Sequence, residues 1–127
     1  MGRGARPGPP ASLRVVSLPV DVHAEALDEL DEAAAWYEAR RPGLGFEFAA
    51  EIERVIASIS ARPLAFAPWK AQDPVRRALA SRFPYAVFFD VEPERVVVMA
   101  IAHSSRRPGY WGGRVGPPGR RGKDDAG

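Results

Sequence analysis

The chain has 127 residues, 46% of them hydrophobic, with no cysteine and a formal net charge of +2. This length allows one domain with a buried core, and the lack of cysteine excludes a disulfide scaffold and a Cys-based metal site. The longest apolar run, residues 96–102, is far shorter than the roughly 20 residues of a membrane-spanning helix. No apolar run follows the N-terminal arginines, as it would in a signal peptide. We therefore expect a cytoplasmic protein with no membrane partner.

The charges are distributed unevenly along the chain. Residues 21–62 hold ten acids and four arginines, a balance of −6, whereas residues 63–114 hold eight bases and four acids, a balance of +4. This asymmetry favours a basic face that meets an anionic partner. Ordinary solvated surface accounts for any single arginine equally well.

Residues 1–13 and 115–127 are rich in Gly, Pro and charge, and we expect both segments to be disordered. Residues 14–20 form a short β-like run. Apolar residues then recur every three to four positions over 24–40 and again over 44–61, which predicts two amphipathic helices. Pro42 and Gly43 separate them. This arrangement predicts an antiparallel helical hairpin with an apolar seam.

Strand-like sequence dominates the second half of the chain. Residues 75–81 predict one strand, with Arg76 and Arg77 on opposite faces. Residues 86–91 and 96–102 are almost entirely apolar and are separated by a short acidic turn, which predicts an antiparallel hairpin buried on both faces. The expected fold is α+β, with a helical hairpin on one face of a small, mainly antiparallel four-stranded sheet in the order β-α-α-β-β-β.

A basic and aromatic segment, HSSRRPGYW, follows the last strand at residues 103–111. His103 has the same strand parity as Val97, Met99 and Ile101, so its ring could simply close the core at the strand end. Tyr110 and Trp111 could likewise pack back onto the sheet. The alternative is that a rigid strand presents these groups to a partner.

Five segments, in the same order, resemble the RelE/ParE superfamily of type II toxin–antitoxin toxins. ALDELDEAAAWYE (26–38) is similar to the family's first helix, and PGLGFEF (42–48) to its interhelical turn. The Arg76-Arg77 pair is similar to its second strand. RFPYAVFF (82–89) and IAHSSRRPGYW (101–111) are similar to its last hairpin and exit. The likeness spans residues 14–114, which we treat as the toxin domain.

The resemblance implies a toxin that is neutralised by a cognate antitoxin encoded next to it, with no cofactor. Members act either by binding DNA gyrase or by cutting mRNA in the ribosome. A sheet with helices on one face leaves its other, partly apolar face in need of cover. A disordered antitoxin segment that folds on binding would cover it, and its acids would meet the arginines.

Three hypotheses about function remain open from the sequence: two kinds of active toxin and an inactive remnant. A ribonuclease needs proton transfer and cations on the phosphate, for which the candidates are His103, Arg106 and Tyr110. The groups expected to contact the target or an anion are Arg76, Arg77, Arg82, Arg107, Trp111 and Arg114. Ribonuclease members carry an arginine directly after the aromatic residue of the third strand, but here Ala86 follows Tyr85. We therefore favour a ParE-like toxin that binds gyrase, ahead of a RelE-like endoribonuclease or an inactive remnant.

Overall fold

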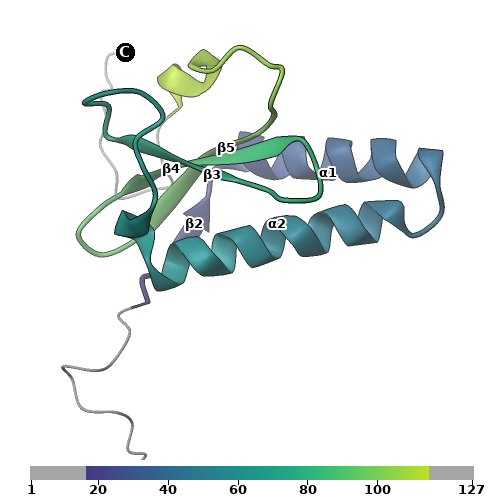
Figure 1. Cartoon of the computed structure of the whole chain (residues 1–127), viewed down its shortest axis with the longest axis horizontal. Helices are drawn as coiled ribbons and strands as arrows, with labels where there is room; N and C mark the ends of the chain where they lie inside the picture. Colours follow the sequence, from purple (N-terminus) through teal and green to yellow (C-terminus); the bar gives the residue numbers. More distant parts are fainter. Residues whose placement is uncertain (1–16, 115–127) are drawn as a thin grey trace, which may run out of the picture.

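A computed structural model describes residues 17–114. The two terminal segments expected to be disordered, 1–13 and 115–127, lie outside the described residues. Positions 14–16 of the predicted first strand lie outside them as well. The elements run in the order β2 (Val20–Val22), α1 (Ala24–Arg40), α2 (Leu44–Ala61), η2 (Pro63–Ala65), β3 (Val75–Leu79), β4 (Tyr85–Val91), β5 (Val96–His103) and η3 (Tyr110–Gly113). The predicted fold class and element order are confirmed (Figure 1).

The helical hairpin has the predicted bounds because its ends are capped locally. The Nδ1 atom of His23 accepts a hydrogen bond from the Glu25 N–H at the start of α1. The Glu38 carboxylate, near the end of α1, accepts the N–H groups of Gly43 (2.9 Å) and Gly45 (3.0 Å) and so caps α2. Gly43 adopts a left-handed conformation with φ of 90°.

Gly45 allows the two helices to approach closely. A Cβ atom at this position would lie 2.4 Å from the carbonyl oxygen of Ala34 on α1. The PGLG turn is therefore explained by one glycine that reverses the chain and a second that lets the helices touch.

The four strands form one sheet in the order β2-β5-β4-β3, with β2 parallel to β5 and the other pairs antiparallel. Of the β-like run predicted over 14–20, residues 14–16 lie outside the described residues, residues 17–19 are not a strand, and Val20 begins β2. At Leu18 the backbone N–H bonds to the carbonyl of Ser60 at the end of α2 instead of to a strand. The next residue, Pro19, already joins the sheet, since its carbonyl accepts the Val96 N–H of β5 at 2.8 Å.

The predicted strand over 75–81 ends at Leu79 because the next turn is held by α2. The buried carboxylate of Glu51 accepts hydrogen bonds from the Ser81 N–H and hydroxyl, both at 2.8 Å, and from Arg54 at 2.9 Å. The Ser81 N–H, the Arg54 guanidinium and the Ser81 hydroxyl outweigh the effect of burial and lower the pKa of Glu51 to about 2.

The hairpin is buried on both faces as expected, but a β-bulge changes its parity. Phe88 is opposite Ala100 and Phe89 is opposite Val98, so Met99 has no partner residue across the ladder. Val98 and Ile101 therefore both face the helices. The prediction that Val97 lies on the same side as Ile101 and His103 is wrong for this reason.

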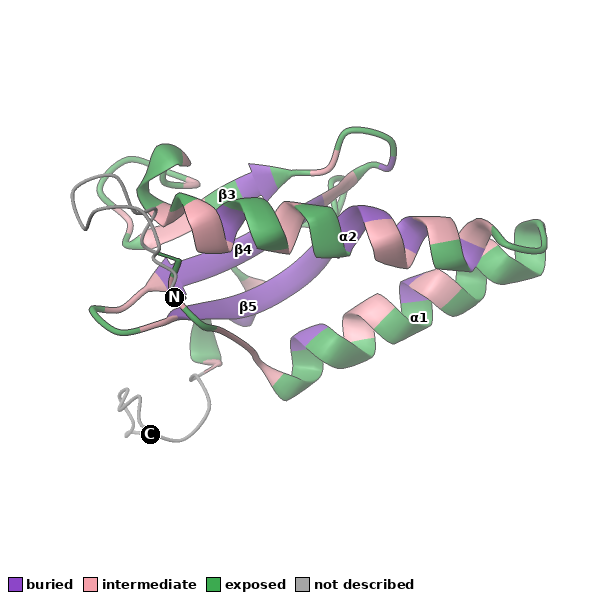
Figure 2. Cartoon of the chain, turned by 90° about the horizontal axis from the view of Figure 1, so that it is seen from below, coloured by how far each residue is buried: buried purple, intermediate pink, exposed green. Residues whose placement is uncertain are grey.

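The core has two parts, one on each face of the sheet. The larger part lies under the two helices (Figure 2) and includes Phe48, Ile52 and Phe89. On the other face Phe88 packs against Trp111 and Trp69, with ring centroids 5.0 and 6.4 Å away. The η3 turn lies on this side, away from α2 (Figure 1). The face expected to need cover is thus covered in part by the chain itself.

Candidate functional site

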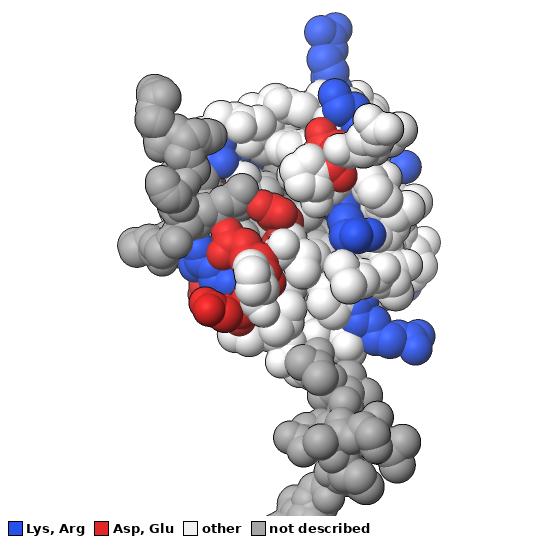
Figure 3. All heavy atoms as spheres, turned by 90° about the vertical axis from the view of Figure 1, so that its left-hand side faces the viewer, with Lys and Arg blue, Asp and Glu red and all other residues white. Residues whose placement is uncertain are grey.

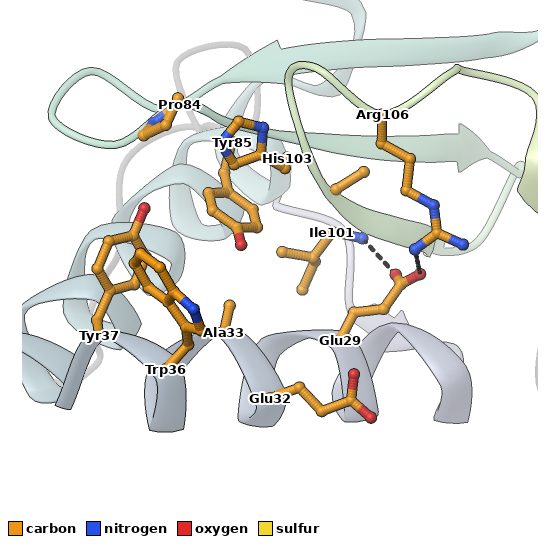
Figure 4. Close-up of a pocket in the computed structure, with 11 residues that line it drawn as sticks. Glu29, Glu32, Ala33, Trp36, Tyr37, Pro84, Tyr85, Ile101, His103 and Arg106 are labelled. Atoms are coloured by element: carbon orange, nitrogen blue, oxygen red, sulfur yellow. Dashed lines mark hydrogen bonds and ion pairs between the residues drawn. The ribbon is translucent and has the colours of Figure 1, made fainter. Parts of the chain in front are cut away.

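A cleft of about 520 Å³ opens between α1 and the end of the β4–β5 hairpin (Figure 4). We call it the α1–β5 cleft. Helix α1 forms one side, and the strand ends and the segment after β5 form the other. Its lining residues are Glu29, Glu32, Ala33, Trp36, Tyr37, Pro84, Tyr85, Ile101, Ala102, His103 and Arg106.

Aromatic side chains make up one end of the α1–β5 cleft. Tyr37 and Tyr85 face each other with ring centroids 6.2 Å apart, and Trp36 packs edge-on to Tyr37 at 5.2 Å. Trp36 is 52% exposed, and the Arg40 guanidinium lies 3.7 Å above its ring. An exposed tryptophan beside a cleft is a typical contact for a protein partner.

Glu29 organises the other end of the cleft. Its carboxylate accepts the Ile101 N–H at 2.9 Å, the Tyr110 hydroxyl at 2.7 Å and the Arg114 guanidinium at 3.0 and 3.2 Å. Burial raises the pKa of Glu29, but the Arg114, Ile101 and Tyr110 hydrogen bonds outweigh it, and the net pKa is lowered. Glu29 therefore joins α1, β5 and the C-terminal segment as a partly buried, ionised anchor.

Tyr110 is held as a hydrogen-bond donor to Glu29. Burial, together with the bond to the Glu29 carboxylate, raises the pKa of its hydroxyl. The guanidinium carbons of Arg106 and Arg114 lie 3.6 and 5.1 Å from its ring centroid. A tyrosine in this environment keeps its proton and supports the position of Arg106.

His103 is exposed at the end of β5 instead of closing the core. Its Nδ1 atom accepts the Ser105 N–H at 3.0 Å and lies 2.8 Å from the Ser105 hydroxyl, while its ring is 5.3 Å from that of Tyr85. Because Nδ1 is an acceptor, the proton of the neutral ring lies on Nε2. The side of the ring away from Ser105 is therefore a donor in this state.

The predicted site residues do not form a single cluster. His103 and Arg106 line the α1–β5 cleft, whereas Arg107, Tyr110 and Trp111 line a second cleft on the other side of the C-terminal segment. Trp111 is buried in the smaller core, with only 3% of the residue exposed.

The remaining predicted arginines differ in how far they are engaged. Arg76 donates to the Phe66 carbonyl, and Arg82 pairs with Glu47 at 3.0 Å. Arg114 pairs with Glu25 and Glu29, each at 3.0 Å, and only 12% of its side chain is exposed. Arg77 is exposed on β3.

The cations are scattered over the surface. On the face seen in Figure 3, Lys and Arg side chains stand apart, separated by uncharged surface, and acids lie beside several of them. Residues 17–114 contain no group of three His, Cys, Asp or Glu side chains that could hold a metal ion. No helix within these residues is long and apolar enough to cross a membrane.

The sequence contained a signal for Glu29 that the prediction missed. Glu29 follows Ala26 by three residues and precedes Ala33 by four, and both alanines are buried. An acid in this position lies on the buried stripe of the helix and requires a partner. Trp36 and Tyr85 were also missed as lining residues, because their place depends on how α1 crosses the hairpin.

The element order and the C-terminal segment are those expected of the RelE/ParE superfamily. The family model described as "ParE toxin of type II toxin-antitoxin system, parDE" matches residues 20–108. The chain therefore belongs to the ParE toxin family, which confirms the superfamily and the branch expected from the sequence.

A solved structure gives the same fold. The chain is similar to a chain of the "Chromosomal ParDE TA system from P. aeruginosa", with 17% identity and a TM-score of 0.61. The match covers 68% of this chain and 96% of the other. At this identity the likeness supports the fold alone. No curated protein sequence matches the chain.

Proposed function

We propose that this ParE-family toxin is neutralised by a cognate antitoxin and inhibits DNA gyrase by binding it, without chemistry of its own. The main observation in support is that the groups that catalysis would need form hydrogen bonds within the protein. The Tyr110 hydroxyl donates to Glu29, and the Nδ1 atom of His103 accepts from Ser105.

Metal-free RNA cleavage requires a base for the 2′-hydroxyl and a cation close to the phosphate. Tyr110 cannot serve as the base near neutral pH, because its raised pKa keeps the hydroxyl protonated. Ala86, at the place where ribonuclease members carry arginine, is 3% exposed and packs in the smaller core. The sheet face away from the helices therefore lacks a positive charge at this position.

The α1–β5 cleft offers features suited to binding. Trp36 and the Tyr37–Tyr85 pair give it a broad apolar end, and Arg106 places a half-exposed cation at the other end. Large aromatic residues and arginine supply much of the affinity in protein interfaces. We propose that an antitoxin segment occupies this cleft and thereby covers Arg106, so that antitoxin and target exclude each other.

The test uses purified full-length protein and gyrase in a plasmid supercoiling assay. Wild-type protein should inhibit supercoiling, and the double variant Arg106→Ala/Arg107→Ala should inhibit much less. Arg62→Ala, an exposed arginine at the C-terminal end of α2, serves as the matched control and should behave as wild type.

A parallel reaction with translating ribosomes and a reporter mRNA separates the alternatives. Cleavage of the mRNA, without an effect on gyrase, would contradict the proposal and favour the endoribonuclease. Absence of both effects would favour an inactive remnant.

A further inference from the structure

A second cleft, of about 580 Å³, lies on the sheet face away from the helices, between the loop after η2 and the η3 turn. We call it the Trp69–Trp111 cleft. The two tryptophans pack edge to face with ring centroids 5.4 Å apart. The cleft is separate from the α1–β5 cleft, and the two share no lining residue, although Arg107, which the supercoiling test above replaces together with Arg106, lines this second cleft.

Both indole N–H groups in this cleft lack a hydrogen-bond partner. Among residues 17–114, Trp69 Nε1 and Trp111 Nε1 are the only buried side-chain nitrogen or oxygen atoms without one. An unsatisfied buried donor costs about 1–3 kcal/mol and is rare in native structures. Packing on Phe88 could be achieved by phenylalanine without that cost. Two orphaned donors on tryptophans that line one cleft are therefore available to an acceptor that enters it.

The charged groups around the cleft favour an anionic acceptor. Lys70 and Arg107 both line it, and neither forms an ion pair with an acid of the described segment. The Lys70 ammonium lies 5.0 Å from the centre of the Trp69 ring. Asp73 is the acid in the lining, and its Oδ1 atom already accepts the Val75 N–H at 2.8 Å.

Access to the two indole nitrogens requires the rim of the cleft to shift. Each indole nitrogen exposes less than 1 Å², so an acceptor reaches it only when the rim shifts. Gly109, in a left-handed conformation, and Gly112 belong to this rim, and a Cβ atom at Gly112 would meet no atom within 4 Å. Glycine at these two positions lowers the conformational cost of such a shift.

We infer that the Trp69–Trp111 cleft binds a carboxylate of a protein partner, an Asp or Glu side chain. The two indole N–H groups donate to its oxygens, and Lys70 and Arg107 neutralise its charge. A nucleic-acid backbone fits less well, since it would require a continuous line of free cations. Two cations beside Asp73 match one carboxylate better than a chain of phosphates.

Indole N–H signals in a ¹⁵N-labelled full-length protein test the inference directly. The chain has three tryptophans, and the exposed Trp36 is an internal control. Titration with the peptide acetyl-Gly-Glu-Gly-amide should shift the Trp69 and Trp111 signals downfield in a saturable manner and leave Trp36 unchanged. The peptide acetyl-Gly-Gln-Gly-amide should have little effect. In Lys70→Ala/Arg107→Ala, binding should weaken at least tenfold.

A second variant separates the donor from the packing role. Trp69→Phe keeps an aromatic ring but removes one unsatisfied N–H, so peptide binding monitored at Trp111 should weaken several-fold while the melting temperature stays at or above that of wild type. The inference is overturned if neither signal shifts, if Trp36 shifts equally, or if the Gln peptide binds as well as the Glu peptide. It is also overturned if inorganic phosphate or a short single-stranded oligonucleotide shifts both signals and the Glu peptide does not.

Discussion

Removing the Glu29 carboxylate should destabilise the protein more than removing any other acid of α1. Its side chain is 13% exposed, and that of its main partner Arg114 is 12% exposed. In Glu29→Ala the Arg114 charge loses its closest buried partner, and the Ile101 N–H and Tyr110 hydroxyl lose their acceptor. Glu29 is thus the one residue whose loss affects α1, β5 and the C-terminal segment together.

The expected magnitude follows from these contacts. Breaking a buried ion pair by removing one partner costs about 3–5 kcal/mol. We therefore expect the free energy of unfolding of Glu29→Ala to fall by about 3–5 kcal/mol, a large part of the roughly 5–15 kcal/mol of a typical domain. Glu29→Gln keeps the shape and one acceptor, so its loss should be smaller, about 2 kcal/mol.

Urea unfolding of the full chain, followed by tryptophan fluorescence and circular dichroism, measures this loss. Glu32→Ala, one turn away and exposed, is the matched control and should change stability by less than about 0.5 kcal/mol. A double-mutant cycle with Arg114→Ala should give a coupling above about 1 kcal/mol. A Glu29→Ala protein as stable as Glu32→Ala would refute the anchor role.

Three further predictions concern the helix contact, the pH dependence and the toxic surface. Gly45→Ala should cost about 1–3 kcal/mol in urea unfolding because its Cβ meets a backbone carbonyl of α1, whereas Gly113→Ala should be neutral; equal stability of the two would contradict this. Glu51 has a pKa lowered from 4.5 to about 2, so its stabilising contribution is full above pH 4.5 and is lost as the pH falls through 2. Glu51→Gln should therefore flatten the acid limb of a pH-stability curve, and an unchanged slope would count against it. Arg106→Ala/Arg107→Ala should relieve growth arrest on induction while the melting temperature changes by only a few degrees, since both side chains are exposed; full toxicity of the folded variant would remove them from the site.

The sequence predicted the elements whose cause is local. Both helices have the expected bounds, because the apolar period and the turn around Gly43 and Gly45 determine them. Within the described residues the first strand starts later than the predicted run, because Leu18 bonds to a distant helix end instead of to a strand. The bulge at Met99 was missed, since nothing in a continuous apolar run marks an unpaired residue.

The sequence predicted which segment carries the candidate site residues, but not how their side chains are arranged in space. The basic and aromatic exit after β5 is present, with His103 and Arg106 beside one cleft and Trp111 buried in another. A one-dimensional pattern cannot tell on which side of a segment each side chain falls. The place of Glu29 on the buried stripe of α1 marked it as an acid that needs a partner, but only the fold shows that this partner is Arg114, 85 residues later.

We propose that this toxin stops DNA synthesis by binding gyrase and does not cut RNA. The most direct measurement is a short induction of the full chain in a bacterial host, with parallel pulse labelling of new DNA and new protein. The account predicts an early fall in DNA labelling with filamentous cells and intact mRNA, and rescue by co-expressed antitoxin. An early fall in protein labelling with cleaved mRNA would contradict it and return His103, Arg106 and Tyr110 to consideration as catalytic residues.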